Sequence, residues 1–281
     1  MTIEQRMLER SDTLTRSERR IGETILSTPE LVAFGTVAEV ATAASVGTAT
    51  VVRFAVKLGF DGYSELQAAA RREVSGQLRP AVERIRDPHV DHDDVLIQRH
   101  ADVETTNVGS TLAGLDAAAV GAVVDRLADT EHAVLVLSGV ASRGVAQQFV
   151  GDLEQLRPDV RLLDGTPIDI VRTLALAGDD ATLVVLDLRR YEQWLLDALH
   201  QAASLWTVAI TDSVLSPLAA SADRALVVAA ASAGPFDSHV GTLALLNYLV
   251  IGVAVAQRGG ATVRLDRLEA AWRSAGALTE D

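Results

Sequence analysis

The stretch TVAEVATAASVGTATVVRFAVKLGF, Thr36 to Phe60, decides the fold of the N-terminal part of the chain. Two apolar stripes run through it, each with apolar residues at i, i+3, i+4 and i+7. The residues are Val37, Val40, Ala41 and Ala44 in the first stripe and Val51, Phe54, Ala55 and Leu58 in the second. Because a turn around residues 45–47 separates the stripes, we expect two short amphipathic helices that pack on each other.

The second helix of this pair carries a small, polar and basic outward face. At 100° per residue, Arg53 points away from the apolar stripe, and Ala49, Thr50, Val56 and Lys57 flank it. Such a helix suits the second helix of a helix-turn-helix, which enters the major groove of DNA. An ordinary helical hairpin with a solvated face has the same periodicity, so the spacing leaves both interpretations open.

Upstream of this pair the sequence also indicates helices. Thr15 and Glu18 have the spacing of a capping box, and Ile21 and Ile25 begin the apolar stripe of the helix that follows. Thr36 is the expected N-cap of the next helix. We therefore predict an all-α bundle over residues 1–79.

Composition and charge narrow the class of protein. The chain has 281 residues, of which 48% are hydrophobic and 22% charged, and it has 0 Cys. This profile fits a folded protein and excludes disulfides and thiolate metal sites. The start of the chain lacks a signal-peptide pattern, so we expect a cytoplasmic protein. The first 79 residues hold ten basic and ten acidic side chains, so the net charge of −13 falls on the remainder. A local basic patch on a neutral domain is compatible with DNA binding.

A charged, Pro-containing stretch over residues 80–100 is the expected linker, which leaves residues 101–281 as a second domain. Five of its residues are metal-ligand types: His89, Asp91, His92, Asp93 and Asp94. Their spacing does not put two His side chains on one helix face, so we interpret them as a solvated run whose Asp93 or Asp94 caps the next helix. We expect no metal and no cofactor.

From about residue 133 short apolar runs alternate with helix-length stretches. The runs are Ala133 to Ser138, Val160 to Asp164, Thr182 to Leu188, Trp206 to Thr211 and Ala225 to Ala229. Strands without a polar face are typical of a parallel sheet, so we predict a doubly wound α/β domain with five parallel strands. Ligands bind such sheets at the carboxyl ends of strands, here loops 138–144, 187–192 and 211–216. The apolar run Val240 to Ala256 is too short and too interrupted for a membrane span and predicts a core helix or a subunit interface.

Residues Leu14 to Ala69 resemble the N-terminal domain of the RpiR family of bacterial transcriptional regulators, through SERRI, TVAEVA, TATVVRF and KLGFDGYSEL. The remainder, from about 100 to 260, is similar to the sugar isomerase (SIS) domain of that family, most typically in SPLAASAD, Ser216 to Asp223. The resemblance implies a DNA-binding regulator with an effector-sensing domain that forms a homodimer or homotetramer. It therefore also implies that the partner is double-stranded DNA with a palindromic operator. We expect no interaction with a membrane.

The resemblance also implies which residues bind DNA. The recognition helix is about Thr48 to Leu58, and Arg can bridge the two acceptors of a guanine. The residues expected at the DNA are Thr48, Thr50, Arg53 and Lys57, with Thr36 and Tyr63 as phosphate contacts. Where family members often have Gly in the turn, this chain has Ser45, and Gly47 precedes the helix.

In the SIS-like domain the phosphate-binding loops depart from the family pattern. The first loop has Ser138 and Val140 at the usual glycines, keeps Ser142 and adds Arg143. In the second loop, carboxylates and arginines replace the Ser-x-Ser-Gly-x-Thr pattern: Asp187, Arg189, Arg190 and Glu192. Three interpretations stay open: an anionic, sugar-phosphate-like effector held by Arg, an internal ion pair that closes a dead pocket, or Arg at a subunit interface. The expected effector residues are Ser138, Ser142, Arg143, Asp187, Arg189, Arg190, Thr211 and Ser213.

SIS domains also occur in aldose–ketose isomerases, so catalysis or inert sugar-phosphate binding is the alternative function. The candidate proton-transfer groups are His239 and Asp237, then Glu131 or Glu192. Asp237, Ser238 and His239 are of triad type, but neighbours on one chain point in different directions. We therefore expect Asp237 or Ser238 to cap a helix and the chain not to be an enzyme.

Overall fold

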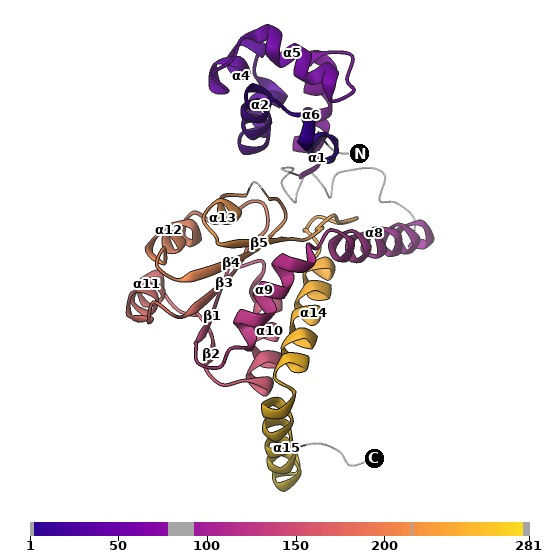
Figure 1. Ribbon diagram of the computed structural model, residues 1–281. Coiled ribbons are helices and arrows are strands. Elements are labelled where there is room, and N and C mark those ends of the chain that lie inside the picture. Colours follow the sequence, from indigo (N-terminus) through magenta and orange to yellow (C-terminus); the bar gives the residue numbers. More distant parts are fainter. Residues whose placement is uncertain (1–2, 78–92, 215, 278–281) are drawn as a thin grey trace. The chain divides into compact units, whose positions relative to one another are not determined.

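The computed structural model describes residues 3–77, 93–214 and 216–277, and the chain divides into two compact units, residues 1–86 and 87–281 (Figure 1). Most of the expected linker lies outside the described residues, as do His89, Asp91 and His92. The last eight residues of the range assigned to the linker are helical, because the helix α8, Asp93–Ala113, begins there. The domain boundary itself stays a prediction.

Unit 1 is all helical, as predicted. Its elements are α1 (Ile3–Leu8), a 3-10 turn (Ser11–Thr13), α2 (Arg16–Ser27), α3 (Pro29–Phe34), α4 (Val37–Ala43), α5 (Thr48–Lys57) and α6 (Tyr63–Gln77). Both expected caps form. Thr15 and Glu18 make a capping box at α2, and Thr36 makes a second one with Glu39 at α4. Each box satisfies two backbone N–H groups that a helix start otherwise leaves unpaired.

The pair α4–α5 has the packing that the apolar stripes predict. Val51, Phe54, Ala55 and Leu58 are fully buried. Ser45, in the turn between the helices, has φ +52°, the left-handed conformation for which glycine is better suited. Arg20 of α2 donates to the Ser45 carbonyl at 3.0 Å, and this hydrogen bond holds the turn against α2.

Unit 2 contains the predicted parallel sheet. Its strands are β1 (Val134–Ser138), β2 (Val160–Leu162), β3 (Thr182–Leu186), β4 (Trp206–Thr211) and β5 (Arg224–Val227). They lie in the order β2-β1-β3-β4-β5, and every neighbouring pair is parallel. The helices are α8 and α9 (Ala117–Ala128), α10 (Arg143–Leu156), α11 (Pro167–Leu176), α12 (Gln193–Gln201), α13 (Pro217–Ala220), α14 (Val240–Ala256) and α15 (Arg258–Ala275).

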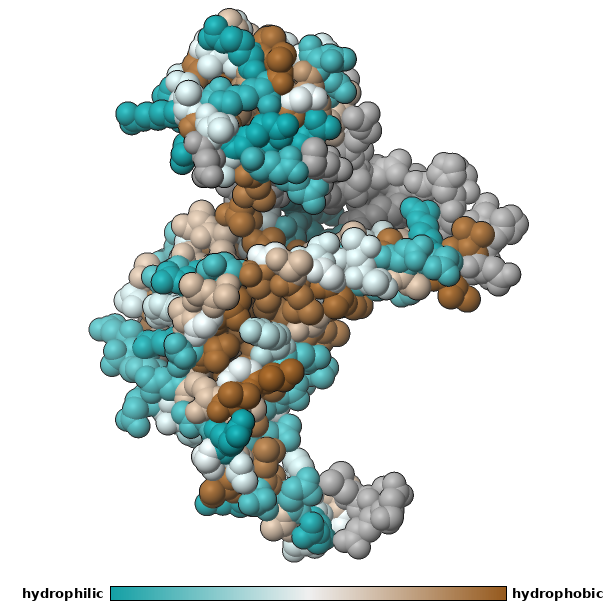
Figure 2. Space-filling model, turned by 45° about the vertical axis from the view of Figure 1, so that its right-hand side comes forward, coloured by the Kyte–Doolittle hydropathy of each residue, from teal (hydrophilic) through white to brown (hydrophobic). Residues whose placement is uncertain are grey.

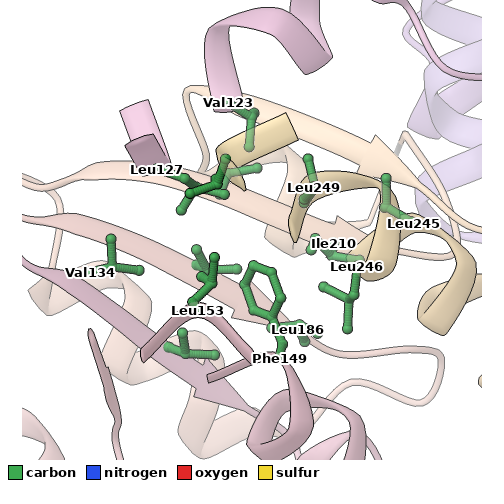
Figure 3. Packing of buried hydrophobic residues seen from close by; sticks show 14 of the residues in the cluster. Val123, Leu127, Val134, Phe149, Leu153, Leu186, Ile210, Leu245, Leu246 and Leu249 are labelled. Carbon is green, nitrogen blue, oxygen red and sulfur yellow. The ribbon is translucent and has the colours of Figure 1, made fainter. Parts of the chain in front are cut away.

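Two separate hydrophobic cores cover the two faces of the sheet. On β3, Val184 and Leu186 pack toward α9, α10 and α14, where Phe149 and Leu249 are buried (Figure 3). The alternate residues of the same strand pack toward α11, α12 and α13. Helices on both faces make the sheet doubly wound, and the right-handed crossovers of this architecture bring the carboxyl ends of β1, β3 and β4 to one edge.

Within the described residues, no single helix has the length and apolar character that a membrane crossing requires. Two pairs of consecutive helices reach the required apolar length only when both helices are counted together, and each pair is sharply bent. The bend is 85° between α8 and α9 and 104° between α14 and α15.

Candidate functional site

The outward face of α5 carries the residues that the sequence assigns to DNA. Thr48 and Arg53 are exposed and Thr50 is half-buried. Within the described residues the Arg53 guanidinium has no hydrogen-bond or ion-pair partner. Val52 and Val56 lie on the same face and are 39% and 54% exposed. An exposed valine can contact a thymine methyl group, so this face offers both polar and apolar contacts to base edges.

Lys57, expected to face DNA, is half-buried and binds to groups within unit 1. Its ammonium group donates to the Thr13 carbonyl at 2.6 Å and to Glu18 Oε2 at 2.8 Å. Burial opposes ionisation of Glu18, yet the hydrogen bonds from Lys57 and Thr15 keep the Glu18 pKa below its usual value. Lys57 therefore ties the end of α5 to the capped start of α2, a contact that local sequence patterns do not reveal.

The two expected phosphate contacts also have partners within unit 1. The Tyr63 hydroxyl donates to the carbonyls of Val32 and Gly35, at 3.4 and 3.3 Å, and so closes the end of α3. The Thr36 hydroxyl donates to Glu39 Oε2 at 2.8 Å as part of its capping box. Thr36 remains exposed, whereas the Tyr63 hydroxyl is committed to the fold.

In unit 2, the first effector loop joins β1 to α10. Ser138 ends the strand, and Ser142 is the N-cap residue of α10 but forms no capping hydrogen bond. The Ser142 side chain is 1% exposed, and its hydroxyl has no hydrogen-bond partner among the described residues. Arg143 is exposed and forms an ion pair with Asp164. A buried hydroxyl without a partner at a helix N-terminus is a donor that a ligand can use.

The second loop, between β3 and α12, places two carboxylates against backbone N–H groups. Asp187 accepts from the Leu188 N–H at 3.0 Å and from the Glu192 N–H at 2.9 Å. Its carboxylate lies directly against Gly139, where a Cβ atom would overlap it. Burial raises the Asp187 pKa to about 6, and the charge of Glu192 adds to the effect. Glu192 in turn accepts from the Val140 N–H at 2.6 Å.

The arginines of this loop have different roles. Arg189 forms an ion pair with Asp212, with 3.4 Å between Nε and Oδ2, and Tyr191 donates to Asp212 Oδ1 at 2.6 Å. Burial and the Asp212 carboxylate raise the Tyr191 pKa. Arg190 is exposed and has no partner among the described residues. Asp212 directly follows β4, a position from which the sequence could have indicated it.

The remaining effector candidates lie at the end of β4. Thr211 and Ser213 are buried there. The structure thus brings the loops after β1, β3 and β4 to one edge of the sheet. Arg189 is already paired at that edge, and Arg190 is the arginine of the β3 loop that a ligand can reach.

The candidate proton-transfer residues do not form a triad. The Ser238 hydroxyl donates to Glu104 of α8 at 2.6 Å and accepts from the Val240 N–H at 3.1 Å. The N-cap residue of α14 is His239, so the helix begins one residue later than the cap expected at Asp237 or Ser238. Burial lowers the His239 pKa. Within the described residues, no group of three His, Asp or Glu side chains is arranged to hold a metal ion.

Comparison with known proteins agrees with both units. Residues 1–77 match the family model described as a helix-turn-helix domain of the rpiR family. An uncharacterized HTH-type transcriptional regulator of Caldanaerobacter subterraneus subsp. tengcongensis is 26% identical over 255 residues, 88% of each chain. The sugar isomerase domain of an RpiR transcription factor from Sphaerobacter thermophilus is 29% identical with a TM-score of 0.57, and the match covers 62% of this chain and 98% of that domain.

Residues 1–77 are a helix-turn-helix domain of the rpiR family, and the chain has the organisation of a transcriptional regulator with an SIS domain. The solved structure of the Vibrio vulnificus NanR protein, complexed with ManNAc-6P, covers 97% of this regulator and 98% of its own chain. Its TM-score is 0.59 at 18% identity, so the two chains share a fold. The helix-turn-helix and SIS-domain organisation expected from the resemblance is thus confirmed.

The raised pKa of Asp187 predicts a pH-dependent contribution to the stability of this regulator. A carboxyl group whose folded-state pKa is above its unfolded value stabilises the fold at low pH, and the contribution is lost as pH rises through the folded pKa of about 6. The free energy of unfolding of the native chain, minus that of Asp187→Asn, should fall by about 1 kcal/mol between about pH 5 and pH 7. Urea unfolding of both proteins measures it; a difference independent of pH contradicts the raised pKa.

Proposed function

We propose that this regulator binds a palindromic operator as a homo-oligomer and that a small anionic effector of the sugar-phosphate class alters operator binding. The observation that carries the effector part is the buried, unpartnered hydroxyl of Ser142 at the N-terminus of α10. Helix N-termini attract anions through their free N–H groups and the helix dipole. A cytoplasmic location follows from the proposed DNA partner.

The proposed DNA contacts are fewer than the sequence suggests. Arg53 supplies a free guanidinium, and Thr48, Thr50, Val52 and Val56 share its face. We assign direct base contact to Arg53, because its fork can engage both acceptors of a guanine edge. Lys57 and Tyr63 are half-buried and form hydrogen bonds within unit 1.

The effector is proposed to bind where Ser142 and Arg190 are available, at the carboxyl edge of the sheet. The hydroxyl supplies a hydrogen bond and the free guanidinium a positive charge for an anion. The ligand in the complex of the Vibrio NanR protein is a sugar phosphate, which supports this class. We propose sensing rather than catalysis, because Ser238, Arg189 and Glu192 are engaged in contacts within unit 2. An isomerase or inert binding module is the alternative.

The partner of α14 is proposed to be a second copy of the chain. The helix is mostly apolar, with Asn247 as an exposed polar residue, and its Tyr248, Ile251 and Val255 are 48%, 61% and 60% exposed. Figure 2 shows apolar side chains gathered on the surface of unit 2. Surfaces of this kind mark protein–protein contacts, and a two-fold dimer would present two recognition helices to symmetric half-sites.

Replacing Arg53 tests the DNA part of the proposal. Arg53→Ala should weaken binding to DNA from the regulator's own upstream region by about 1–3 kcal/mol and relax the preference at one base pair. Arg53→Lys keeps the charge but loses the bidentate geometry, so it should show a similar loss of preference. Fluorescence anisotropy at fixed salt measures both. Unchanged affinity and preference in Arg53→Ala would remove Arg53 from the interface.

A panel of sugar phosphates and sugar acids, added to the same operator complex, tests the effector part. One compound should release or tighten the DNA, and Arg190→Ala should reduce this response at least tenfold while leaving DNA binding unchanged. Arg224→Ala removes an exposed arginine at the start of β5 and should respond normally. Indifference to every compound contradicts the effector, and a normal response in Arg190→Ala contradicts the role of Arg190.

Ile251→Arg should dissociate the oligomer, because it places a charge in the apolar face of α14. Leu176→Arg is the matched control: Leu176 is also exposed, on α11 at the other side of the sheet. Sedimentation velocity should show the smaller species only for Ile251→Arg. An oligomer that survives this substitution places the interface elsewhere.

A further inference from the structure

Glu192 links the two loops of the proposed effector site. Its Oε1 accepts from the Val140 N–H at 2.6 Å, across 52 residues of sequence, and its Oε2 accepts from the Trp194 indole N–H. Glu192 is the N-cap residue of α12 but forms no capping hydrogen bond there. Its carboxylate therefore binds the neighbouring loop and the Trp194 side chain, and not the backbone N–H groups at the start of α12.

Asp187 occupies N–H groups of the β3 loop in the same way. It accepts from Leu188 and from Glu192, and it fits only because Gly139 has no side chain. Three backbone N–H groups in two loops, those of Val140, Leu188 and Glu192, thus donate to carboxylates of the chain itself. Loop N–H groups beside a helix N-terminus are the donors that proteins use to bind phosphate and carboxylate.

We infer that Glu192 is a tethered competitor of the anionic effector, held on the Val140 N–H that the effector must use. This inference rests on the proposed function. Binding requires the Glu192 carboxylate to leave Val140 and Trp194. The observed association constant therefore equals that of the open site multiplied by the fraction of chains in which Glu192 has left. Charge adds to the effect, since a bound dianion and the Glu192 carboxylate repel each other.

The competitor also sets selectivity. An anion without further contacts gains little binding free energy when it replaces the Glu192 carboxylate on the Val140 N–H group. An effector with a sugar portion adds contacts that the Glu192 side chain cannot supply, so it can displace the carboxylate. Inorganic phosphate should therefore bind the native chain weakly and should bind well once the tethered carboxylate is removed.

The test measures binding of inorganic phosphate to the full chain by calorimetry, at constant ionic strength and pH. Glu192→Ala removes the acceptor and should bind phosphate at least tenfold more tightly than the native chain. Glu192→Gln removes the charge but keeps the length of the side chain. Its phosphate affinity should lie between those of Glu192→Ala and the native chain. Glu131→Gln is the control, because it makes the same charge change at an exposed position before β1, at the other edge of the sheet. Its phosphate affinity should equal that of the native chain.

The Trp194 indole N–H gives a second readout in the native chain. Saturation with phosphate, or with ManNAc-6P, should shift its NMR resonance, because Glu192 leaves the indole when the ligand enters. The resonance is assigned by its absence in Trp194→Phe. Operator binding by each variant, measured in parallel, shows that the variant is folded.

The outcomes separate the two proposals. Ligand binding that leaves the Trp194 resonance in place, or equal phosphate affinity in Glu192→Ala and the native chain, overturns the competitor and leaves the effector proposal intact. Failure of the native chain and both Glu192 variants to bind phosphate or ManNAc-6P, in protein that still binds its operator, overturns both. Tighter binding in Glu192→Ala together with a shifted Trp194 resonance supports both.

Discussion

The central strands of unit 2 have no polar face, and this constraint organises the rest of the unit. Leu183 and Val185 of β3 are buried under one layer of helices, and Val184 and Leu186 under the other. Parallel strands with both faces covered require a helix between each strand and the next. The loops that lead from strands to helices then meet at one edge. Every residue of the proposed effector site stands there because of this connectivity.

Loops at that edge must satisfy N–H groups that no neighbouring strand can pair. In this chain carboxylates of the loops themselves do so: Asp187 accepts from the Glu192 N–H, Glu192 from the Val140 N–H and Asp212 from the Arg189 N–H. Burial raises the pKa of Asp187, and repulsion from the carboxylates of Glu192 and Asp212 adds to the effect. The same residues that order the empty loops therefore make them less receptive to a ligand of like charge.

Local patterns in the sequence predicted what is local in the structure. Strand positions, the capping box at Thr15, the N-cap at Thr36 and the buried stripe of α5 all depend on residues a few positions apart, and each is confirmed. The roles of Lys57 and Glu192 depend on partners 39 and 52 residues away, Glu18 and Val140. No periodicity encodes such pairs, so the sequence predicts neither the Lys57–Glu18 contact nor the Glu192–Val140 contact.

Side-chain hydrogen bonds fix the recognition helix α5 within unit 1, so an effector could hardly change its position there. Lys57 fixes the end of α5 to α2, Arg20 fixes the turn before it, and Tyr63 fixes α6 to the end of α3. Altering the recognition helix would require several of these contacts to break at once, which is costly in a domain of this size. A change in the spacing of two recognition helices needs none of them to break. An effector that binds one arrangement of the oligomer better than another shifts the population toward it, and operator affinity follows that population. Control of DNA binding is therefore most economically a property of the oligomer that unit 2 is proposed to form.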